Sequence, residues 1–384
     1  MSRLEELIKE KCPNGVEYKN LKSFCEIKTG KGITTKDASE DGIYPIISGG
    51  ITPMGYYHEF NRDGDTVTIS RVGANAGFVN YISEKFYLND KCFSVISREN
   101  INNKFLYYSL KNKEKEIVGL QSEGGVPTIN TEKVGSVIVA IPPLEVQEEI
   151  VRILDKFGEL EAELEAELEA RKSQYEFWRG ELLDSDCEEI PLNDLCLKIS
   201  TINWSKDSNE YQYIDLSSVN RDNNAIEETT TIDSSNAPSR ARQIVRTNDI
   251  LFGTTRPMLK RITLVSKEYD NQICSTGYCV LRPNIDRVLP EWVYYILQTN
   301  RFYDYVESFQ QGASYPSISD STVKNYTIPV PSLDKQRKII DVLNKFDTLV
   351  NDISIGLPAE IELRRKQYEY YRNKLLSFEE VSYE

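Results

Sequence analysis

The sequence predicts an α+β protein in which one structural plan occurs twice, each copy being a strand-rich globular region followed by a long helix. Segments 142–157 and 331–346 match at a constant offset of 189 residues, and both begin with helix-starting prolines. Further along, Gln174–Arg179 (QYEFWR) matches Gln367–Arg372 (QYEYYR) at an offset of 193. Two long helices half a chain apart indicate an internal pseudo-twofold, which suits a ligand of two parts. The commonest such ligand is a bipartite DNA site.

The first long helix is expected to run unbroken over about 144–183, because apolar residues recur there at spacings of three and four. At 1.5 Å per residue such a helix spans ~60 Å. An amphipathic helix of this length is expected to pair with its repeat in a coiled coil. In the second helix, Pro358 predicts a break or kink at 355–358, because proline removes a backbone hydrogen bond.

The first helix also contains three consecutive Glu-Leu-Glu-Ala tetrads at 159–170. Four residues advance ~40° past one helical turn, so a tetrad repeat cannot keep a strict heptad seam. Two interpretations stay open. The tetrads are either a solvated acidic helix face or a spacer whose length changes by whole tetrads.

The globular regions follow the same order in both halves: strands, a short helix, a Gly-containing loop, a strand ending in proline, then the long helix. β-Branched and aromatic runs predict strands at 66–69, 93–96, 137–139, 250–252, 262–265 and 278–281. The middles, 30–62 and 200–240, do not align, which fits two modules that read different half-sites. The predicted domains are a first globular domain with an N-terminal helix, a first spacer helix, a second globular domain, and a second spacer helix with the C-terminal tail, at 1–141, 142–185, 186–329 and 330–384.

Charge is distributed unevenly along the 384 residues. The formal net charge of −14 argues at first against nucleic-acid binding. However, residues 141–190 hold 16 acidic and 5 basic residues, a net −11, so the rest of the chain sums to only −3. Segment 238–261 carries a net +5 and segment 20–36 a net +3. Binding depends on the local field, so the total charge does not exclude DNA, although it indicates weak affinity for the isolated chain.

No sequence pattern supports catalysis. The single histidine, His58, cannot supply a repeated Ser/His/Asp or Cys/His set, and we expect it to be a surface or packing residue. The sequence lacks the P-loop, the GxGxxG motif and the Asn-Pro-Pro-aromatic tetrad of amino-group DNA methyltransferases. Seven cysteines without a CxxC pair, and no apolar run of ~18 residues, predict a reduced cytoplasmic protein with neither a metal site nor a membrane span.

In combination, these features resemble the specificity subunit of type I restriction-modification enzymes. The resemblance is carried by the duplicated helix openings and endings, the tetrads, the proline-containing loops at 127–129 and 316–318, and segment 65–77 (DTVTISRVGANAG). It covers essentially the whole chain. The family implies two target-recognition domains, each reading one half of a split double-stranded DNA sequence. Two antiparallel conserved helices would separate the domains and set the gap. The chain itself would have no catalytic activity and no cofactor.

The resemblance also implies partners in a phage-defence complex. Two modification (methyltransferase) subunits would dock on the helices, bind S-adenosylmethionine and flip the target base. Restriction subunits, where a system has them, would use ATP and Mg²⁺. We expect the helices to present apolar residues to these partners, namely Leu144, Ile150, Leu154, Phe157, Leu333, Ile339, Leu343 and Phe346. The alternative is a non-catalytic two-domain coiled-coil adaptor without a role on DNA, which salt-dependent binding of a duplex would distinguish.

The candidate DNA contacts of the first half follow a predicted strand. They are Ser70, Arg71 and Asn75, and the arginine and asparagine offer donors suited to guanine and adenine. Arg71 as a phosphate clamp or a structural ion pair is an equal alternative.

In the second half, the corresponding turn is 253–257, with Thr254 and Arg256, and Lys260 and Arg261 lie beyond it. Arg256 is the better candidate for a DNA contact because its surroundings carry a net positive charge. Upstream, we expect phosphate contacts, which position a protein on DNA without specifying sequence, from Arg240, Arg242 and Arg246.

Overall fold

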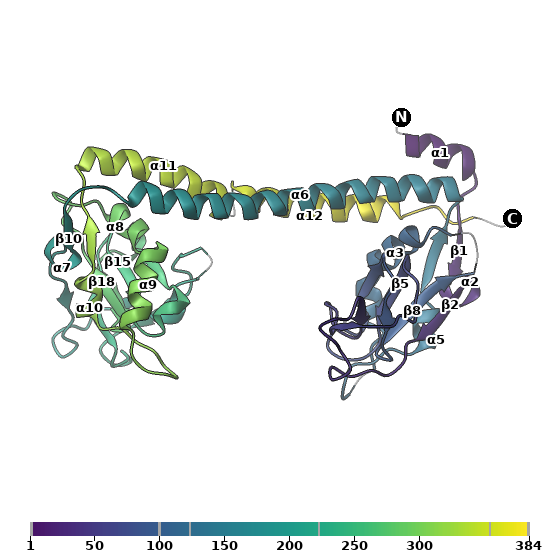
Figure 1. Ribbon diagram of the computed structural model, residues 1–384, viewed down its shortest axis with the longest axis horizontal. Helices are drawn as coiled ribbons and strands as arrows, with labels where there is room; N and C mark the ends of the chain where they lie inside the picture. Colours follow the sequence, from purple (N-terminus) through teal and green to yellow (C-terminus); the bar gives the residue numbers. More distant parts are fainter. Residues whose placement is uncertain (1–2, 99–100, 123, 222, 353–354, 382–384) are drawn as a thin grey trace. The chain divides into compact units, whose positions relative to one another are not determined.

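The computed structural model describes residues 3–98, 101–122, 124–221, 223–352 and 355–381, and it divides into two compact units (Figure 1). Unit 1 comprises Met1–Ala162 and Leu363–Glu384, and unit 2 comprises Glu163–Glu362. Each unit holds one globular domain with parts of the long helices α6 (Leu144–Leu183) and α12 (Leu357–Leu375). Within the described residues, no helix is both long and apolar enough to cross a membrane.

The main sheet of unit 1 has four antiparallel strands in the order β2-β8-β5-β6. Their bounds are β2 (Cys25–Thr29), β5 (Thr66–Ser70), β6 (Val79–Ile82) and β8 (Cys92–Ser97). Every residue of β5 is buried, as expected of a central strand covered on both faces. The helices whose side chains join this core are α2 (Leu21–Phe24), α3 (Asn103–Asn112), α4 (Glu114–Val118) and α5 (Thr131–Gly135).

Three further elements complete unit 1. A smaller sheet has the order β4-β3-β7, with β3 at Tyr44–Ile47, β4 at Tyr56–Tyr57 and β7 at Tyr87–Leu88. Strand β1 (Glu17–Asn20) pairs antiparallel with β9 (Ile138–Ile141) just before α6 begins. The N-terminal helix α1 (Arg3–Lys11) packs through Leu4 into a cluster that also contains Ile150 and Leu154 of α6.

Unit 2 repeats this frame with a different middle. Its three-stranded sheet β16-β15-β18 corresponds to β6-β5-β8, with β15 at Ile250–Gly253, β16 at Ile262–Leu264 and β18 at Tyr278–Leu281. Five other strands form a sheet in the order β11-β14-β17-β12-β13, namely β11 (Ser200–Thr201), β12 (Tyr211–Ile214), β13 (Thr230–Ile232), β14 (Ala241–Ile244) and β17 (Ile273–Ser275). The central segments of the two domains, 30–62 and 200–240, therefore differ in strand order, as predicted.

The helices and outer strands of unit 2 match those of unit 1. Strand β10 (Glu189–Pro191) pairs with β19 (Thr327–Pro329) as β1 pairs with β9. Trp292 is the largest fully buried side chain, and it lies on α8. The helices that cover this domain are α7 (Leu192–Leu195), α8 (Pro290–Ile296), α9 (Asn300–Phe309), α10 (Asp320–Lys324) and α11 (Leu333–Asn351). Short 3-10 turns are η1 (Leu216–Ser218), η2 (Pro257–Leu259) and η3 (Lys267–Tyr269).

Helix α6 has the bounds that the sequence predicts, and the second long helix is interrupted as expected. Helix α6 is continuous over its 40 residues, whereas the second helix is divided into α11 and α12, with Pro358 in the first turn of α12. Gly356 lies at the division, and a Cβ there would be 2.5 Å from the carbonyl oxygen of Thr348. The α+β class, the duplicated frame and the helix break are all confirmed.

Within each unit, part of α6 packs against part of the second helix. In unit 1, Phe157 contacts Tyr368 and Tyr371, with ring centroids 6.3 and 5.5 Å apart, and Glu161 pairs with Arg365 at 2.6 Å. Residue numbers rise along α6 as they fall along α12, so this pairing is antiparallel. In unit 2, the Tyr175 ring stacks on Phe346 at 6.2 Å. The same repeat residues therefore make both contacts, since Phe157 aligns with Phe346 and Tyr368 with Tyr175.

In each unit, one buried glutamine joins the globular domain to its long helix. In unit 1, Gln147 donates to the Pro142 carbonyl at 2.7 Å and accepts from the backbone N–H of Asn102 at 3.0 Å. In unit 2, Gln336 donates to the Pro331 carbonyl at 2.8 Å and accepts from the backbone N–H of Leu289 at 2.9 Å. The two residues are related by the offset of 189, so the repeat extends to individual hydrogen bonds.

Candidate nucleic-acid interface

The turn that follows β5 in unit 1 is fixed to the Gly-containing loop of the same domain. The backbone N–H of Gly73 donates to the Pro127 carbonyl at 2.9 Å, and that of Ile129 donates to the Arg71 carbonyl at 2.9 Å. Gly73 has a φ of +102°, a conformation that favours glycine, and a Cβ there would meet nothing within 4 Å. This turn is therefore open on its outer side.

The turn that follows β15 in unit 2 is fixed in the same way. Here the backbone N–H of Arg256 donates to the Pro316 carbonyl at 2.7 Å, and that of Ile318 donates to the Thr254 carbonyl at 3.0 Å. The predicted correspondence of the two turns is right. However, Arg256 occupies the position of Gly73, and the position of Arg71 is occupied by Thr254. The two candidate arginines are not counterparts.

Side chains of the unit 1 turn are less available than the sequence suggests. Ser70 is only 2 % exposed, so its hydroxyl does not reach the surface, and its inclusion among surface contacts is corrected. The Arg71 guanidinium lies over the Phe93 ring at 5.5 Å and donates through Nη1 to the Asp90 carbonyl at 3.1 Å, while its Nε is buried. Much of the Arg71 side chain is therefore engaged in contacts within its own domain. Asn75 is partly exposed, and its backbone carbonyl accepts from Phe78.

The unit 2 turn presents its basic residues outward. Arg256 and Lys260 are exposed, and both have left-handed backbone conformations, with φ of +49° and +54°. Non-glycine residues in this region cost of order 1–3 kcal/mol and often mark functional sites. The Arg256 guanidinium lies over the Tyr315 ring at 4.3 Å, and the Lys260 ammonium lies over the Tyr303 ring at 4.7 Å.

Two other predicted contacts of this turn differ in accessibility. Thr254 is 7 % exposed and donates its hydroxyl to the Gly277 carbonyl at 2.9 Å, so it is a structural residue and is corrected as a DNA contact. Arg261 is partly buried beside Gly253, and its carbonyl accepts from the Gly253 N–H.

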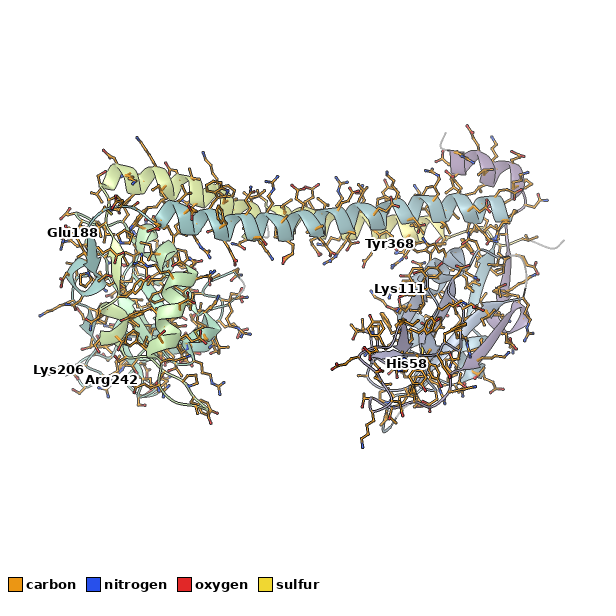
Figure 2. The ribbon with its side chains drawn as sticks, in the orientation of Figure 1. His58, Lys111, Glu188, Lys206, Arg242 and Tyr368 are labelled. Carbon is orange, nitrogen blue, oxygen red and sulfur yellow. The ribbon has the colours of Figure 1, made fainter. Side chains whose placement is uncertain are left out.

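The basic stretch upstream of the turn is exposed as well. Arg240, Arg242 and Arg246 all lie on the surface. Arg242 is at the end of the unit 2 globular domain remote from α11 (Figure 2). Arg246 pairs with Asp270 at 3.5 Å. A hydrogen bond from the Thr247 backbone and the nearby Arg246 hold the pKa of Asp270 below its ordinary value, so this acid stays ionised.

The one acid within 238–261 contributes little to the surface charge. Asp249 is buried and receives two hydrogen bonds from Arg282, at 2.8 and 2.7 Å. The carboxylate of Asp249 raises the pKa of Arg282, as expected of a compact buried pair. Because Asp249 is neutralised in the interior by a residue outside the stretch, the surface of 238–261 is more positive than its sequence total.

The expected partner-binding residues on the helices are mostly used inside the chain. Ile150, Leu154 and Leu343 are fully buried in the cores of their own units, and their assignment to a partner surface is corrected. Ile339 and Phe346 pack against the core of unit 2, Phe157 packs on Tyr371, and Leu144 and Leu333 are partly buried. Apolar spacing predicts that a face is covered but does not say by what.

Other apolar residues of the helices stay exposed. On α6, Phe177 and Trp178 are exposed and pack edge to face at 5.3 Å. On α12, Tyr370 and Tyr371 pack in the same way at 5.3 Å, and Tyr370 is exposed. These pairs are the last two aromatic residues of the QYEFWR and QYEYYR segments, whose first aromatic residues, Tyr175 and Tyr368, pack on the neighbouring helix. The sequence shows these residues as a repeat, whereas their exposure follows from the fold.

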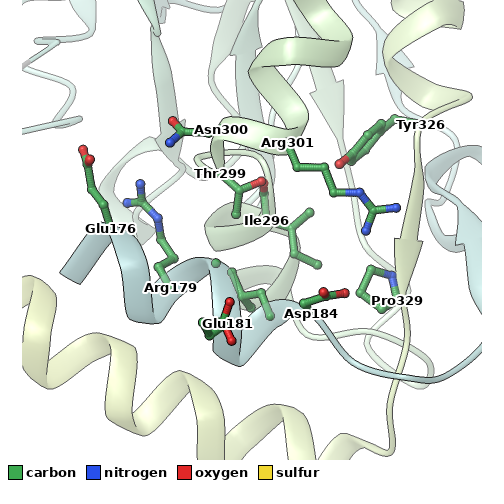
Figure 3. Close-up of a pocket in the computed structure, with 12 residues that line it drawn as sticks. Glu176, Arg179, Glu181, Asp184, Ile296, Thr299, Asn300, Arg301, Tyr326 and Pro329 are labelled. Atoms are coloured by element: carbon green, nitrogen blue, oxygen red, sulfur yellow. The ribbon is translucent and has the colours of Figure 1, made fainter. Parts of the chain in front are cut away.

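A pocket of about 230 Å³ lies in unit 2 between the end of α6 and helices α8 and α9 (Figure 3). Arg179, Asp184 and Arg301 are among its polar lining residues. Arg179 donates to the Gln298 carbonyl at 3.0 Å, and Arg301 pairs with Glu189 at 2.6 Å. The arginines thus have partners within the chain, and we assign no ligand to this pocket.

His58, the single histidine, is exposed in unit 1.

The chain consists of two globular domains that share one frame, each followed by a long helix. The chain belongs to the type I restriction-modification DNA specificity family, whose domain model matches residues 13–170 and again 184–363. It is a specificity subunit with two target-recognition domains. The family membership supports this interpretation and not the adaptor without a DNA role.

Individual relatives agree with this assignment. A putative type I specificity subunit of Mycoplasma pneumoniae is 30% identical over 85% of this chain and 97% of its own length. A type I restriction enzyme specificity subunit of Escherichia coli is 31% identical over 61% of this chain and 60% of its own length. The crystal structure of a type I S subunit from M. genitalium has a TM-score of 0.57 at 17% identity, covering 94% of this chain and 96% of that one, and it supports the fold.

Proposed function

We propose that this chain reads a bipartite double-stranded DNA target, one half-site for each globular domain, and that the long helices set the gap between the half-sites. The observation that carries the proposal is a shared frame with divergent middles. The same turn-to-loop hydrogen bonds occur in both domains, whereas the surrounding sheets differ in strand number and order. One binding mode with two different surfaces is what recognition of two unlike half-sites requires.

The DNA-facing residues we propose lie at the turns and the basic stretch. In unit 2 they are Arg256, Lys260 and the upstream arginines, because these side chains are exposed. Phosphate contacts release counterions, so log K should fall linearly with log salt. The test is to titrate the full chain, with its modification subunits, against a duplex at several salt concentrations. Affinity that does not change with salt would contradict a DNA role for these residues.

We also propose that the chain binds two modification subunits and that these, rather than the chain, hold S-adenosylmethionine and carry out methyl transfer. Restriction subunits, where the system has them, would use ATP and Mg²⁺. The exposed residues Phe177 and Trp178 of α6 and Tyr370 of α12 support two similar docking surfaces, because aromatic residues are enriched at interfaces. Light scattering on the purified assembly should give two modification subunits per chain. A stable one-to-one assembly at saturating partner would contradict the twofold arrangement.

A further inference from the structure

The loop between α9 and α10 of unit 2 presents an aromatic ring to solvent. Tyr315 is 70 % exposed, and it lies at the tip of the loop 310–317. This loop extends from the end of the domain remote from α11 (Figure 1), the same end at which Arg242 lies (Figure 2). Exposure of a single apolar side chain is common, but a large ring at a loop tip beside exposed cations is a combination that needs an explanation.

The loop that carries Tyr315 is rigidly closed. Gln311 and Ser317 exchange two backbone hydrogen bonds, each of 2.8 Å, so the tip is bounded by a paired bridge. Gly312 has a φ of +100°, and a Cβ there would be 3.0 Å from the Tyr315 carbonyl oxygen, so the loop folds tightly on itself. Pro316 further restricts the backbone of Tyr315 to extended conformations. The backbone that carries the ring is thus held in place before any ligand binds, which lowers the entropy cost of binding.

A cation supports the ring. The Arg256 guanidinium lies 4.3 Å from the centroid of Tyr315, and the backbone of Arg256 is bonded to Pro316 of the same loop. Ring and charge therefore form one unit, the Arg256–Tyr315 pair. A flat apolar surface joined to a fixed positive charge matches a nucleotide, whose base is flat and whose phosphate is negative.

Unit 1 has the same loop with different chemistry. Ser122 donates its backbone N–H to the Thr128 carbonyl at 2.9 Å, and the tip residue Val126 is 64 % exposed. The position of Arg256 is occupied by Gly73, which has no side chain. The same turn and loop thus carry an aromatic ring and a cation in unit 2, and a small aliphatic side chain and a glycine in unit 1. A backbone structure that is the same in both domains but carries different side chains is expected of a surface that distinguishes two ligands.

We propose that the Tyr315 ring packs against a base of the half-site read by unit 2, with Arg256 supplying the adjoining positive charge. This inference rests on the proposed function and adds a readout residue that the sequence patterns did not indicate. Aromatic side chains contact bases by stacking or as wedges at a base step. The ring carries no charge, so its contribution should be independent of salt, whereas that of Arg256 should not.

The test compares variants of the full chain, in complex with its modification subunits, on a duplex that carries the two-part motif obtained by methylation mapping. Tyr315→Ala should weaken binding by at most about 5- to 150-fold, which corresponds to about 1–3 kcal/mol for one base stacked on an aromatic ring in a single strand. Parting a base step of the duplex offsets some of this gain. Its salt slope should equal that of the wild type. Tyr315→Phe should bind like the wild type, because the ring is retained. Arg256→Ala should reduce the salt slope by about one if the guanidinium meets a phosphate.

Ile285→Ala is the matched control, because Ile285 is a large exposed apolar residue of the same unit. It should bind like the wild type. Wild-type affinity in Tyr315→Ala, or an equal loss in Tyr315→Phe and Tyr315→Ala, would overturn this inference alone. Failure of the wild-type complex to bind the duplex in a salt-dependent way would overturn the proposed function as well. Unchanged thermal melting of Tyr315→Ala confirms that the variant is folded, as expected for a side chain with this exposure.

Discussion

Single buried residues connect each recognition domain to its helix, and Gln147 is the clearest of them. Gln147→Ala would leave the Asn102 N–H and the Pro142 carbonyl without their partner. We expect a loss of about 1–3 kcal/mol in the free energy of unfolding, the usual cost of an unsatisfied buried polar group. Urea unfolding of the purified chain measures it. Gln174→Ala, at an exposed position of α6, is the control and should change little. Equal stability of both variants would contradict the structural role.

The two candidate arginines should respond differently to substitution. Arg256 is exposed, so Arg256→Ala should leave the melting temperature unchanged. It should weaken one half-site by about 1–3 kcal/mol if the guanidinium makes a bidentate base contact, and reduce the salt slope by about one if it meets a phosphate. Arg71→Ala should affect the other half-site and also lower stability, because the guanidinium packs on Phe93 and bonds to the Asp90 carbonyl. Binding to duplexes with one altered half-site, together with thermal melting, checks both effects. If both variants weakened all duplexes equally, the arginines would be phosphate clamps.

Residue type alone could not have separated these cases. Both arginines follow a buried strand in a glycine-containing turn, and only the net positive charge around Arg256 distinguishes them in the sequence. The loop residues align at an offset of 189, whereas the turns align at 183, so Arg71 corresponds to Thr254. That difference follows from which loop carbonyl each backbone N–H reaches, a long-range fact absent from local sequence. The burial of Ser70 and Thr254 has the same origin.

At the scale of elements, the helices test whether local sequence determines their bounds. Gly158 lies in the exposed interior of α6, and a Cβ there would meet nothing within 4 Å. Gly158→Ala should therefore stabilise the chain by about 0.5–1 kcal/mol. Gly356→Ala places a Cβ 2.5 Å from the Thr348 carbonyl oxygen and should destabilise it by about 1–3 kcal/mol. Urea unfolding compares the two. Stabilisation by Gly356→Ala would show that the division between α11 and α12 is not sterically required.

Elements defined by local signals were predictable, and those defined by distant pairing were not. Apolar periodicity and Pro358 predict α6 and the break before α12, because both depend on neighbouring residues. The parallel pairing of β12 with β17 joins segments about sixty residues apart, and no local pattern in 200–240 indicates it. The prediction that Ile150 and Leu343 face partner subunits does not hold, because both side chains are fully buried in the cores of their own units. Apolar periodicity predicts that a helix face is buried, but it does not identify the surface against which that face packs.

In the whole molecule, the tetrads test whether the length of the helices sets the gap between the two half-sites. A Glu-Leu-Glu-Ala tetrad adds ~6 Å and ~40° of rotation, while one base pair adds ~3.4 Å and ~34–36° of rotation. The rotational match favours one base pair per tetrad. Deleting Glu163–Ala166 should therefore leave both half-sites intact and shorten the unspecified gap by one base pair, as methylome mapping would reveal. Replacing Glu163 and Glu165 by Gln, at constant length, is the control. An unchanged gap in the deletion variant would identify the tetrads as a solvated acidic face.

We expect this chain to direct methylation to two separate half-sites at a fixed distance. The most direct test is methylome sequencing of a host that carries this chain and its modification subunit, compared with the same host lacking the chain. We predict chain-dependent methylation at one motif made of two specified parts separated by an unspecified gap of constant length. A continuous motif, a gap of variable length, or methylation that does not depend on the chain would contradict the account.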